Sequence, residues 1–304
     1  MSLTISNGEE KINKGHLILK NVPLSRYCTY GTGGSCDYFC QPKNLEEVQI
    51  ALAWAKKNHQ KVTILGCGSN VLISDAGVEG LVIITTLLTS YHVRGTLLCC
   101  EAGLAVDSAI NLSIDNYLSG LEPLGGLPGS VGGAVYGSAS ANGLAIATLL
   151  EWVDYLDSQG NLNRYHINGG GFSYKVSPFT NTTNFIWEVT FRLKGTNNPS
   201  QKRREKEESR LKREEEGQYA YPSAGCIFKN PPQGPAGYFI EKAGFKGKRL
   251  EGARVSDKHA NFIIKEDCHV TSQAIYELSS LVQTGVKEAF GITLEREIRL
   301  IGRW

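Results

Sequence analysis

Residues 125–134 constrain the fold of this chain more than any other stretch. They contain five glycines and one proline in ten positions, with no charged residue. This composition argues against a helix and against an uninterrupted strand. A solvated linker would normally be rich in Ser, Glu or Lys, whereas this stretch carries Leu127, Val131 and Ala134. We therefore expect packed backbone, which lies either against a large phosphate-bearing cofactor or against other parts of the protein.

A second glycine loop, residues 66–70, follows a short apolar strand predicted for Val62–Leu65. A dinucleotide-binding Rossmann turn needs G-x-G-x-x-G at the start of a helix. Here the third glycine is missing, and the next residues, Val71–Ser74, have the apolar pattern of another strand. The pattern disfavours a Rossmann domain. It leaves two alternatives, a plain hairpin or a loop whose backbone N–H groups hold a phosphate.

The rest of the chain predicts a mixture of strands and helices. The helices are expected at residues 45–57 after the N-cap Asn44, after Asp107 acting as a cap, at 201–216, and after Thr271 or Ser272. The stretch 201–216 is almost wholly charged, so we expect a solvent-exposed helix that marks a domain boundary. A strand is expected at Leu294–Ile301, with Glu295 and Glu297 on one face.

The overall composition narrows the class of protein. A length of 304 residues favours two domains, and a net charge of +2 gives no field that would attract nucleic acid or an acidic membrane. No run approaches the ~20 apolar residues of a membrane span, and the N-terminus is polar. We therefore expect a cytoplasmic protein with eight reduced cysteines. Cys36 and Cys40 resemble half a zinc site without its second half, so no metal is expected.

The stretch Pro222–Pro231 places a thiol, an ammonium and an amide close together, at Cys226, Lys229 and Asn230. Its two prolines prevent an easy continuation of helix at either end. One interpretation is a turn into a buried strand, in which the cysteine is a small hydrophobic residue. The other is a functional strip that presents these three groups to a ligand.

Four segments together resemble the UDP-N-acetylmuramate dehydrogenase family, also called UDP-N-acetylenolpyruvoylglucosamine reductase. They are residues 222–231, 252–264, 125–134 and 294–302, and the resemblance extends from about Leu24 to Gly302 in the shorter family subtype. It implies an α+β fold with a FAD-binding domain of the vanillyl-alcohol-oxidase or p-cresol-methylhydroxylase type and a smaller α/β substrate-binding domain. We place the first at residues 1–198, with subdomains of about 1–85 and 86–198. The second covers residues 199–304, and its last strand, 294–301, returns toward the flavin.

The resemblance also implies the reaction. NADPH reduces a non-covalent FAD, NADP leaves, and UDP-N-acetylglucosamine enolpyruvate enters the same site. Flavin N5 then gives hydride to the vinyl CH2 carbon, and an acid of the protein protonates the adjacent carbon. The product is UDP-N-acetylmuramate, a peptidoglycan precursor. The resemblance implies no partner other than these small molecules, and we expect a monomer.

The catalytic residues implied by the resemblance are Cys226, Lys175 and Glu297. Cys226 stands where most of the family has a proton-donating serine, and an ordinary thiol, with a pKa of about 8.5, is mostly protonated at neutral pH. Lys175 stands where the family has an arginine, and lysine lacks the planar fork that binds a carboxylate through two hydrogen bonds. Arg164 or Arg254 could compensate for this change.

These roles leave simpler alternatives open. Lys175 could be a surface lysine, and Glu297 could be a strand-edge carboxylate paired with Arg299. The remaining residues implied by the resemblance are, for FAD, Gly66, Gly68, Ser69, Asn70, Pro128, Gly129, Ser130, Gly132 and Gly133, and, for the substrate, Tyr174, Lys229, Asn230 and His259. The substrate residues could instead be structural. The chain has Ser138 and Asn142-Gly143 where the family usually has Asn and Tyr-Gly, so flavin contacts there are not carried over.

Two other functions remain compatible with the sequence. One is a different flavoenzyme of the same superfamily, such as an oxidase of sugar alcohols, which the stretch Pro222–Pro231 argues against. The other is a nucleotide-binding protein without catalysis, in which Lys175 and Cys226 have drifted from the family residues.

Overall fold

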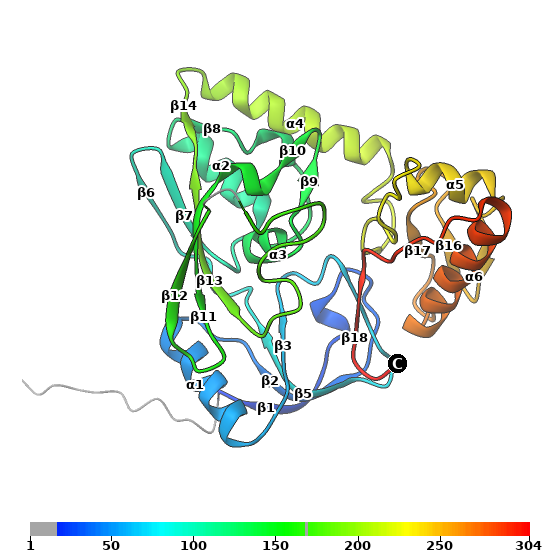
Figure 1. Ribbon diagram of the computed structural model, residues 1–304, viewed down its shortest axis with the longest axis horizontal. Coiled ribbons are helices and arrows are strands. Elements are labelled where there is room, and N and C mark those ends of the chain that lie inside the picture. Colours follow the sequence, from blue (N-terminus) through cyan, green and yellow to red (C-terminus); the bar gives the residue numbers. More distant parts are fainter. Residues whose placement is uncertain (1–16, 168–169) are drawn as a thin grey trace, which may run out of the picture.

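The computed structural model describes residues 17–167 and 170–304. Two sheets with their helices form the larger part of the molecule, and a smaller part with α5 and α6 lies beside them (Figure 1). Within the described ranges, no helix is long and apolar enough to cross a membrane. All eight cysteines are unpaired thiols.

The N-terminal part is a four-stranded sheet. Its strands lie in the order β1 (Leu19–Pro23), β2 (Ser35–Cys40), β5 (Val78–Ile84) and β3 (Val62–Leu65). The pairs β2–β5 and β3–β5 are parallel, and β1–β2 is antiparallel. Helix α1 (Leu45–Lys57) covers this sheet, and the Glu47 backbone N–H donates to the Asn44 side chain, which confirms the predicted cap.

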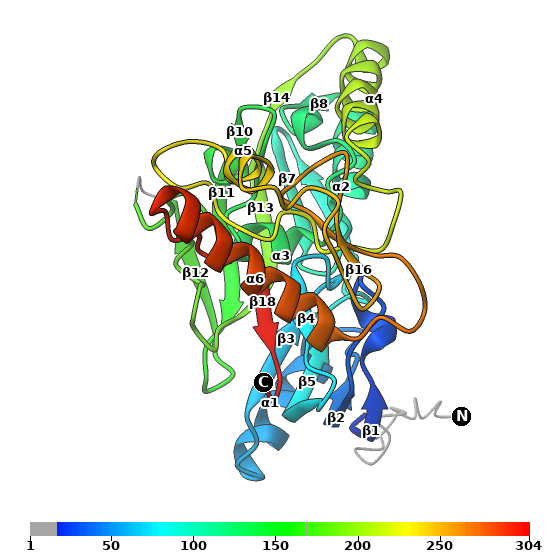
Figure 2. The same cartoon turned by 90° about the vertical axis from the view of Figure 1, so that its right-hand side faces the viewer.

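The glycine loop 66–70 does not close a hairpin. Strand β4 (Val71–Ile73), which follows the loop, pairs in parallel with β18 (Arg299–Ile301) and not with β3. The hairpin alternative is therefore wrong, since the loop carries the chain from one sheet to another. The C-terminal strand returns beside the N-terminal part of the chain to make this pair (Figure 2).

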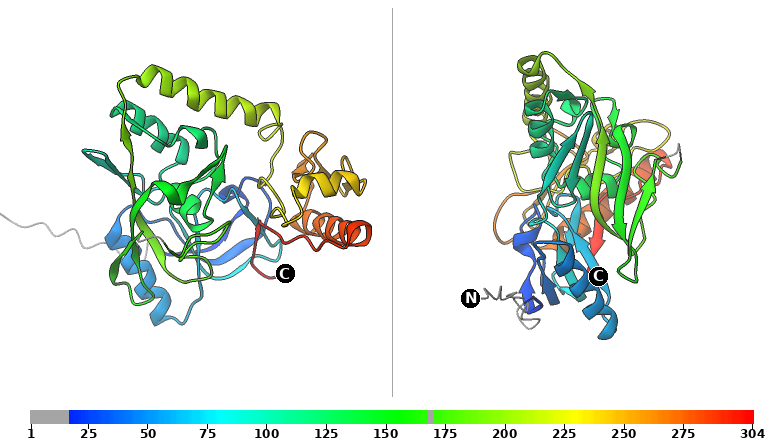
Figure 3. Two further views of the ribbon diagram at one scale, coloured as in Figure 1. Left: turned by 45° about the horizontal axis from the view of Figure 1, so that its top comes forward. Right: turned by 90° about the vertical axis from the view of Figure 1, so that its left-hand side faces the viewer.

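The middle of the chain forms a five-stranded antiparallel sheet. Its order is β12 (Leu162–His166), β11 (Leu150–Leu156), β13 (Phe185–Arg192), β7 (Leu97–Glu101) and β6 (Tyr91–Arg94). Apolar side chains of its inner face share a core with helices α2 (Val106–Asp115) and α3 (Val131–Tyr136). The right-hand view of Figure 3 shows this sheet from the left-hand side of Figure 1. Two separate short strand pairs belong to the same part of the chain, β8 (Leu118–Ser119) with β14 (Lys194–Gly195) and β9 (Ser140–Ala141) with β10 (Leu144–Ala145).

Helix α3 lies partly inside the glycine-rich stretch 125–134, so the expectation that this stretch contains no helix is wrong from Val131 onward. The Gly133 N–H donates to the Ser130 hydroxyl, which caps the helix. A Cβ at Gly132 would lie 2.7 Å from the Ala102 Cβ. Glycine therefore permits the helix to approach the end of β7, and tertiary packing outweighs the low helix propensity of this short segment.

The cap expected at Asp107 is also wrong. Helix α2 begins at Val106 with Ala105 as N-cap, and Asp107 lies in its first turn. The Asp107 carboxylate accepts a hydrogen bond from the Gly126 N–H at 3.0 Å. The side chain therefore holds the glycine-rich stretch rather than its own helix end.

The charged stretch 201–216 is helical as predicted, as part of α4 (Pro199–Glu215). Most of its side chains are exposed, but Arg213 is buried and its Nε donates to the Gly125 carbonyl at 3.2 Å. The helix lies along α2 and the short 3-10 turn Glu122–Leu124 (Figure 1). It therefore contacts the part of the chain that precedes the domain boundary predicted at residues 198–199.

The C-terminal part combines a small sheet with two helices. The sheet order is β15 (Arg249–Leu250), β16 (Ala253–Val255) and β17 (Ile263–Lys265), and the helices are α5 (Ala236–Lys242) and α6 (Ser272–Phe290). Thr271 caps α6, as expected, and Gly291 ends it with φ +71°. Buried residues of α6 share one core with buried residues of the N-terminal sheet. This continuous core fixes the C-terminal part against the N-terminal sheet.

Candidate active site

Lys175 and Glu297 meet in the centre of the site. Lys175 sits in a tight turn, with Ser173 and Val176 bonded to each other, and has φ +59°. Its Nζ lies 2.6 Å from Glu297 Oε1, and the two side chains are only 17% and 14% exposed. The ion pair excludes the interpretation of Lys175 as a free surface lysine. Glu297 is not paired with Arg299, whose guanidinium lies over the Tyr136 ring at 4.5 Å.

The backbone of Glu297 joins the two halves of the site. Its N–H donates to the Ile227 carbonyl at 2.8 Å, inside the stretch Pro222–Pro231. Its carbonyl accepts from Asn70 Nδ2 at 3.3 Å, and Arg299, at the start of β18, donates its N–H to the Asn70 carbonyl. The end of the chain therefore runs between the predicted substrate strip and the glycine loop 66–70.

Cys226 lies beside this ion pair. It is half-buried and bridges to Phe262 in the small C-terminal part. Burial raises the pKa of its thiol to about 12, with a further rise from the Glu297 carboxylate and an opposing effect from the Lys175 ammonium. This pKa is well above the ordinary value used in the sequence analysis. The thiol therefore stays protonated at neutral pH, as a proton donor requires.

A cavity of about 330 Å³ opens at Cys226. Its lining includes Asn230, Tyr238, Lys258 and His259. The Nδ1 atom of His259 is buried and has no hydrogen-bond partner among the described residues. Burial lowers the pKa of His259, so the ring is neutral at physiological pH. An unpaired polar atom of this kind beside a cavity is suited to a polar ligand group.

The other predicted substrate residues are tied to protein groups. The Asn230 N–H donates to the Tyr174 hydroxyl at 3.2 Å, which links the Lys175 turn to the strip. The Asn230 side-chain oxygen accepts from the Ala236 N–H at the start of α5. Lys229 forms an ion pair with Glu295 at 2.6 Å. The structure therefore brings Tyr174 and Asn230 to the site, while the Lys229 ammonium is held at its edge by Glu295.

The two glycine loops contact each other. The Ser69 hydroxyl donates to the Pro128 carbonyl at 3.0 Å, and a Cβ at Gly129 would lie 2.9 Å from Ser69 Oγ. A Cβ at Gly66 would collide with Ser130 Oγ. Glycine at these two positions therefore lets the two loops approach each other closely, because a side chain at either would collide with a serine of the other loop.

Two of the predicted cofactor glycines face protein instead. Gly68 has φ +64°, and a Cβ there would strike the Tyr27 carbonyl. Gly132 lies against Ala102, as described for α3. A third, Gly133, uses its N–H for the Ser130 cap. The close approaches that the structure shows at these three positions serve packing and helix capping.

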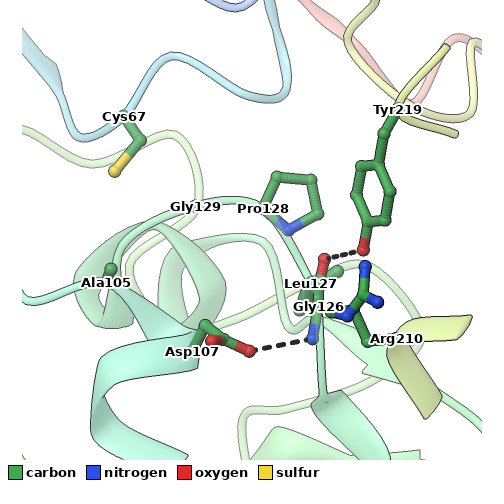
Figure 4. Close-up of a pocket in the computed structure, with 9 residues that line it drawn as sticks. All are labelled: Cys67, Ala105, Asp107, Gly126, Leu127, Pro128, Gly129, Arg210 and Tyr219. Atoms are coloured by element: carbon green, nitrogen blue, oxygen red, sulfur yellow. Dashed lines mark hydrogen bonds between the residues drawn. The ribbon is translucent and has the colours of Figure 1, made fainter. Parts of the chain in front are cut away.

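A cavity of about 350 Å³ borders the loops on the side of α4 (Figure 4). The Tyr219 hydroxyl donates to the Gly126 carbonyl at 2.6 Å, and Asp107 accepts from the Gly126 N–H. Cys67 and Arg210 complete its wall (Figure 4). Asp107 and Tyr219 come from separate elements and hold the N–H and the carbonyl of Gly126. The cavity lies beside the backbone that they hold.

Sequence reasoning missed the clamp formed by Asn261. Its Oδ1 accepts from the Phe228 N–H at 3.0 Å and its Nδ2 donates to the Phe228 carbonyl at 2.8 Å. The suggested compensating arginines are also occupied elsewhere, because Arg164 pairs with Asp154 and Arg254 pairs with Glu266 at 2.9 Å. The clamp residue lies within the recognised segment 252–264, but its contact across the fold has no local sequence signature.

The fold and the paired glycine loops match a known cofactor-binding class. The family model of the FAD binding domain matches residues 36–165. This part of the chain thus belongs to the FAD-binding proteins. A second family model, the C-terminal domain of UDP-N-acetylenolpyruvoylglucosamine reductase, matches residues 217–301. The predicted α+β fold, a FAD-binding domain followed by a smaller C-terminal one, is confirmed.

Full-length relatives agree with both matches. UDP-N-acetylenolpyruvoylglucosamine reductase 2 of Bacillus cereus is 36% identical over 289 residues, which cover 95% of this chain and 94% of the relative. The reductase of Lactiplantibacillus plantarum is 35% identical and covers 94% of each chain. The crystal structure of the reductase from Thermus caldophilus superposes with a TM-score of 0.78 and 30% identity, covering 93% of this chain and 98% of that one. The chain belongs to the UDP-N-acetylenolpyruvoylglucosamine reductase family.

Proposed function

We propose that the chain uses NADPH to reduce the enolpyruvyl ether of UDP-N-acetylglucosamine to UDP-N-acetylmuramate, through a non-covalently bound FAD. The observation that carries this proposal is the Lys175–Glu297 ion pair beside a protonated Cys226, at the junction of the glycine loops and a polar cavity. Cation, carboxylate and acid are the groups that addition of hydride and a proton to an enolpyruvyl double bond requires.

The cofactor fits the glycine cradle. Gly66 and Gly129 let the two glycine loops meet, and a cavity of about 350 Å³ lined by residues of both loops lies beside this contact, so we assign the FAD phosphates to this place. Held there, FAD would supply the hydride-transfer chemistry between NADPH and the vinyl CH2 carbon of the substrate. The chain itself supplies binding, charge stabilisation and the proton.

Lys175 stabilises the charge that develops on the substrate. When hydride adds to the CH2 carbon, the electron pair of the double bond moves toward the carboxylate as an enolate, and an ammonium group beside it lowers the energy of that state. Glu297 holds the lysine at 2.6 Å and fixes its position. Lysine gives a point charge in place of the planar fork of arginine, so the position of the Lys175 ammonium depends more on Glu297.

Cys226 completes the reaction by protonation. The enolate electron pair forms a C–H bond with the thiol proton at the carbon next to the new CH3 group, and the thiolate regains a proton from solvent. A thiol with a pKa of about 12 keeps its proton until a strong carbon base is formed. The thiolate that results is stabilised in part by the nearby Lys175 ammonium.

Substrate binding is assigned to the cavity at Cys226. His259, Asn230 and Tyr174 supply polar groups, and Lys229 reaches the substrate phosphates after it releases Glu295. We retain residues 1–198 as the FAD-binding domain and 199–304 as the substrate-binding domain, and we propose a monomer.

The experiment that tests the proposal follows the flavin colour. The purified protein should be yellow, NADPH should bleach it under anaerobic conditions, and the enolpyruvyl nucleotide should restore the colour. A colourless protein that does not rebind FAD would contradict any flavin-dependent function, including a sugar-alcohol oxidase. A flavin that NADPH reduces but the enolpyruvyl nucleotide does not reoxidise would contradict this substrate alone.

A further inference from the structure

The outer face of the five-stranded sheet carries an unusual row of polar groups. Leu98 and Cys100 of β7 point into the core shared with α2 and α3, so Cys99 and Glu101 point to the opposite face. The register places Cys99 opposite both His92 of β6 and Thr190 of β13. These residues therefore lie on one face, away from the helices that carry the glycine loops.

Three carboxylates occupy neighbouring positions in this row. Glu188 lies directly opposite Glu101 on one side and Asp154 on the other. Like charges in directly opposed strand positions destabilise a sheet. Arg164 neutralises Asp154 through two hydrogen bonds. Within the described ranges, the basic side chain found next to the Glu188 carboxylate is only that of His92, so a cation beside Glu188 would relieve this repulsion.

The side chains near Glu188 have the composition of a metal site. His92, Cys99 and Glu188 each offer one ligand atom, and these three atoms lie within 4.8 Å of one another. The His92 Nδ1 atom is 3.7 Å from Glu188 Oε2. The Thr190 hydroxyl donates to the Cys99 sulfur at 3.2 Å. A hydrogen bond to the sulfur is what stabilises a metal-bound thiolate from outside the ligand set.

We propose that His92, Cys99 and Glu188 bind one divalent transition metal, for which Zn²⁺ is the best fit, with water as fourth ligand. Sulfur and imidazole ligands disfavour Mg²⁺ and Ca²⁺, which prefer oxygen. Metal–ligand bonds of roughly 2.0–2.3 Å place tetrahedral ligands about 3.3–3.7 Å apart. The 43%-exposed His92 has the freedom to close the remaining gap. Binding forms an S–metal bond and releases the thiol proton to solvent.

The site is independent of the proposed reaction, because it lies on the far face of the sheet from α3. The expectation of no metal in the sequence analysis rested on Cys36 and Cys40, which are not part of it. Its three ligands come from strands β6, β7 and β13, so they form a cluster only after the sheet has folded.

The test uses the FAD-loaded protein with Zn²⁺ and with Co²⁺ as a spectroscopic substitute. Zinc content after dialysis against a weak chelator should approach one per chain. Co²⁺ should give the visible bands of a tetrahedral thiolate complex, at longer wavelengths than the flavin absorbs. Cys99→Ser and His92→Ala should each lower Zn²⁺ affinity by more than ~100-fold, and Thr190→Val by about 10-fold. Cys268→Ser, which removes an exposed thiol, is the matched control and should change nothing.

Two results would overturn the proposal. One is wild-type protein that retains no zinc or gives only an octahedral Co²⁺ spectrum. The other is a thiolate spectrum that persists in Cys99→Ser, which would assign the metal to another cysteine. FAD content and reductase turnover of Cys99→Ser should equal those of the parent and report that the variant is folded. If that variant fails to fold, the His92→Ala result decides, since His92 is exposed.

Discussion

The ammonium of Lys175 and the carboxylate of Glu297 form an ion pair at 2.6 Å, although the two residues lie far apart in the sequence. One lies in a tight turn after β12 and the other shortly before β18. This mostly buried pair places a fixed positive charge beside Cys226. The Glu297 carboxylate raises the pKa of the Cys226 thiol, and the Lys175 ammonium lowers it. The arrangement shows how the lysine is held in place at the centre of the site.

Replacing Lys175 tests this arrangement. Lys175→Ala should lower kcat by about 10²–10³-fold, because the charge that stabilises the enolate is lost and Glu297 is left uncompensated. Lys175→Arg should retain most of the activity. Steady-state kinetics at saturating NADPH provides the measurement, with Lys229→Ala, at the edge of the site, as the comparison cation. Equal losses in Lys175→Ala and Lys229→Ala would contradict a specific role for Lys175.

The high pKa of Cys226 gives a prediction for pH dependence. The protonated thiol is the active form. Because its pKa is raised to about 12, the thiol loses its proton only at a higher pH than a free thiol does. The rate of flavin reoxidation by substrate should therefore show no decline through the region near 8.5 where a free thiol titrates, about pH 7.5–9.5. Single-turnover reoxidation measured across this range checks it. A decline centred near ~8.5 that disappears in Cys226→Ser would assign an ordinary pKa to this thiol.

The glycine loops should tolerate no added methyl group at their contact. In Gly66→Ala the new Cβ would collide with Ser130 Oγ, which also caps α3. We expect FAD binding to weaken by about 1–3 kcal/mol because the loop or the cap must shift. Flavin content and FAD titration give the measurement. Gly195→Ala is the control, since a Cβ there meets no atom within 4 Å, and equal FAD affinity in both variants would contradict the cradle.

Asn261 should act as a positioning residue for the strip that carries Cys226. Asn261→Ala leaves the buried N–H and carbonyl of Phe228 without partners, which should cost about 1–3 kcal/mol of unfolding free energy. It should also slow reoxidation of the flavin by substrate more than its reduction by NADPH. Thermal unfolding together with the two half-reactions checks this. A destabilised variant with both half-reactions unchanged would limit Asn261 to a structural role.

Local sequence patterns predicted the elements well where local interactions decide them. The caps at Asn44 and Thr271 and the charged helix α4 follow from side chains within a few residues. Contacts between residues far apart in the sequence could not be predicted from such local patterns. The loop 66–70 resembled a hairpin because β4, the strand that follows it, pairs with β18 at the other end of the chain. Asp107 resembled a cap because its true partner, Gly126, belongs to another element.

The candidate site was predicted mainly through the family resemblance. Residue spacing alone drew attention to Pro222–Pro231 but left a buried turn open as the simpler interpretation. That Lys175 pairs with Glu297, and that Arg164 and Arg254 pair elsewhere, depends on tertiary packing. The raised pKa of Cys226 likewise depends on burial, which no spacing in the sequence reports.

The central claim, that Cys226 donates the proton, is tested most directly by single-turnover kinetics of Cys226→Ala. Reduction of the flavin by NADPH should proceed at the parent rate, because no proton from this thiol is needed there. Reoxidation by the enolpyruvyl nucleotide should slow by about 10²–10⁴-fold, the usual contribution of a general acid, and Cys226→Ser should restore part of it. Reoxidation of Cys226→Ala at a near-normal rate would contradict the claim and require another proton donor.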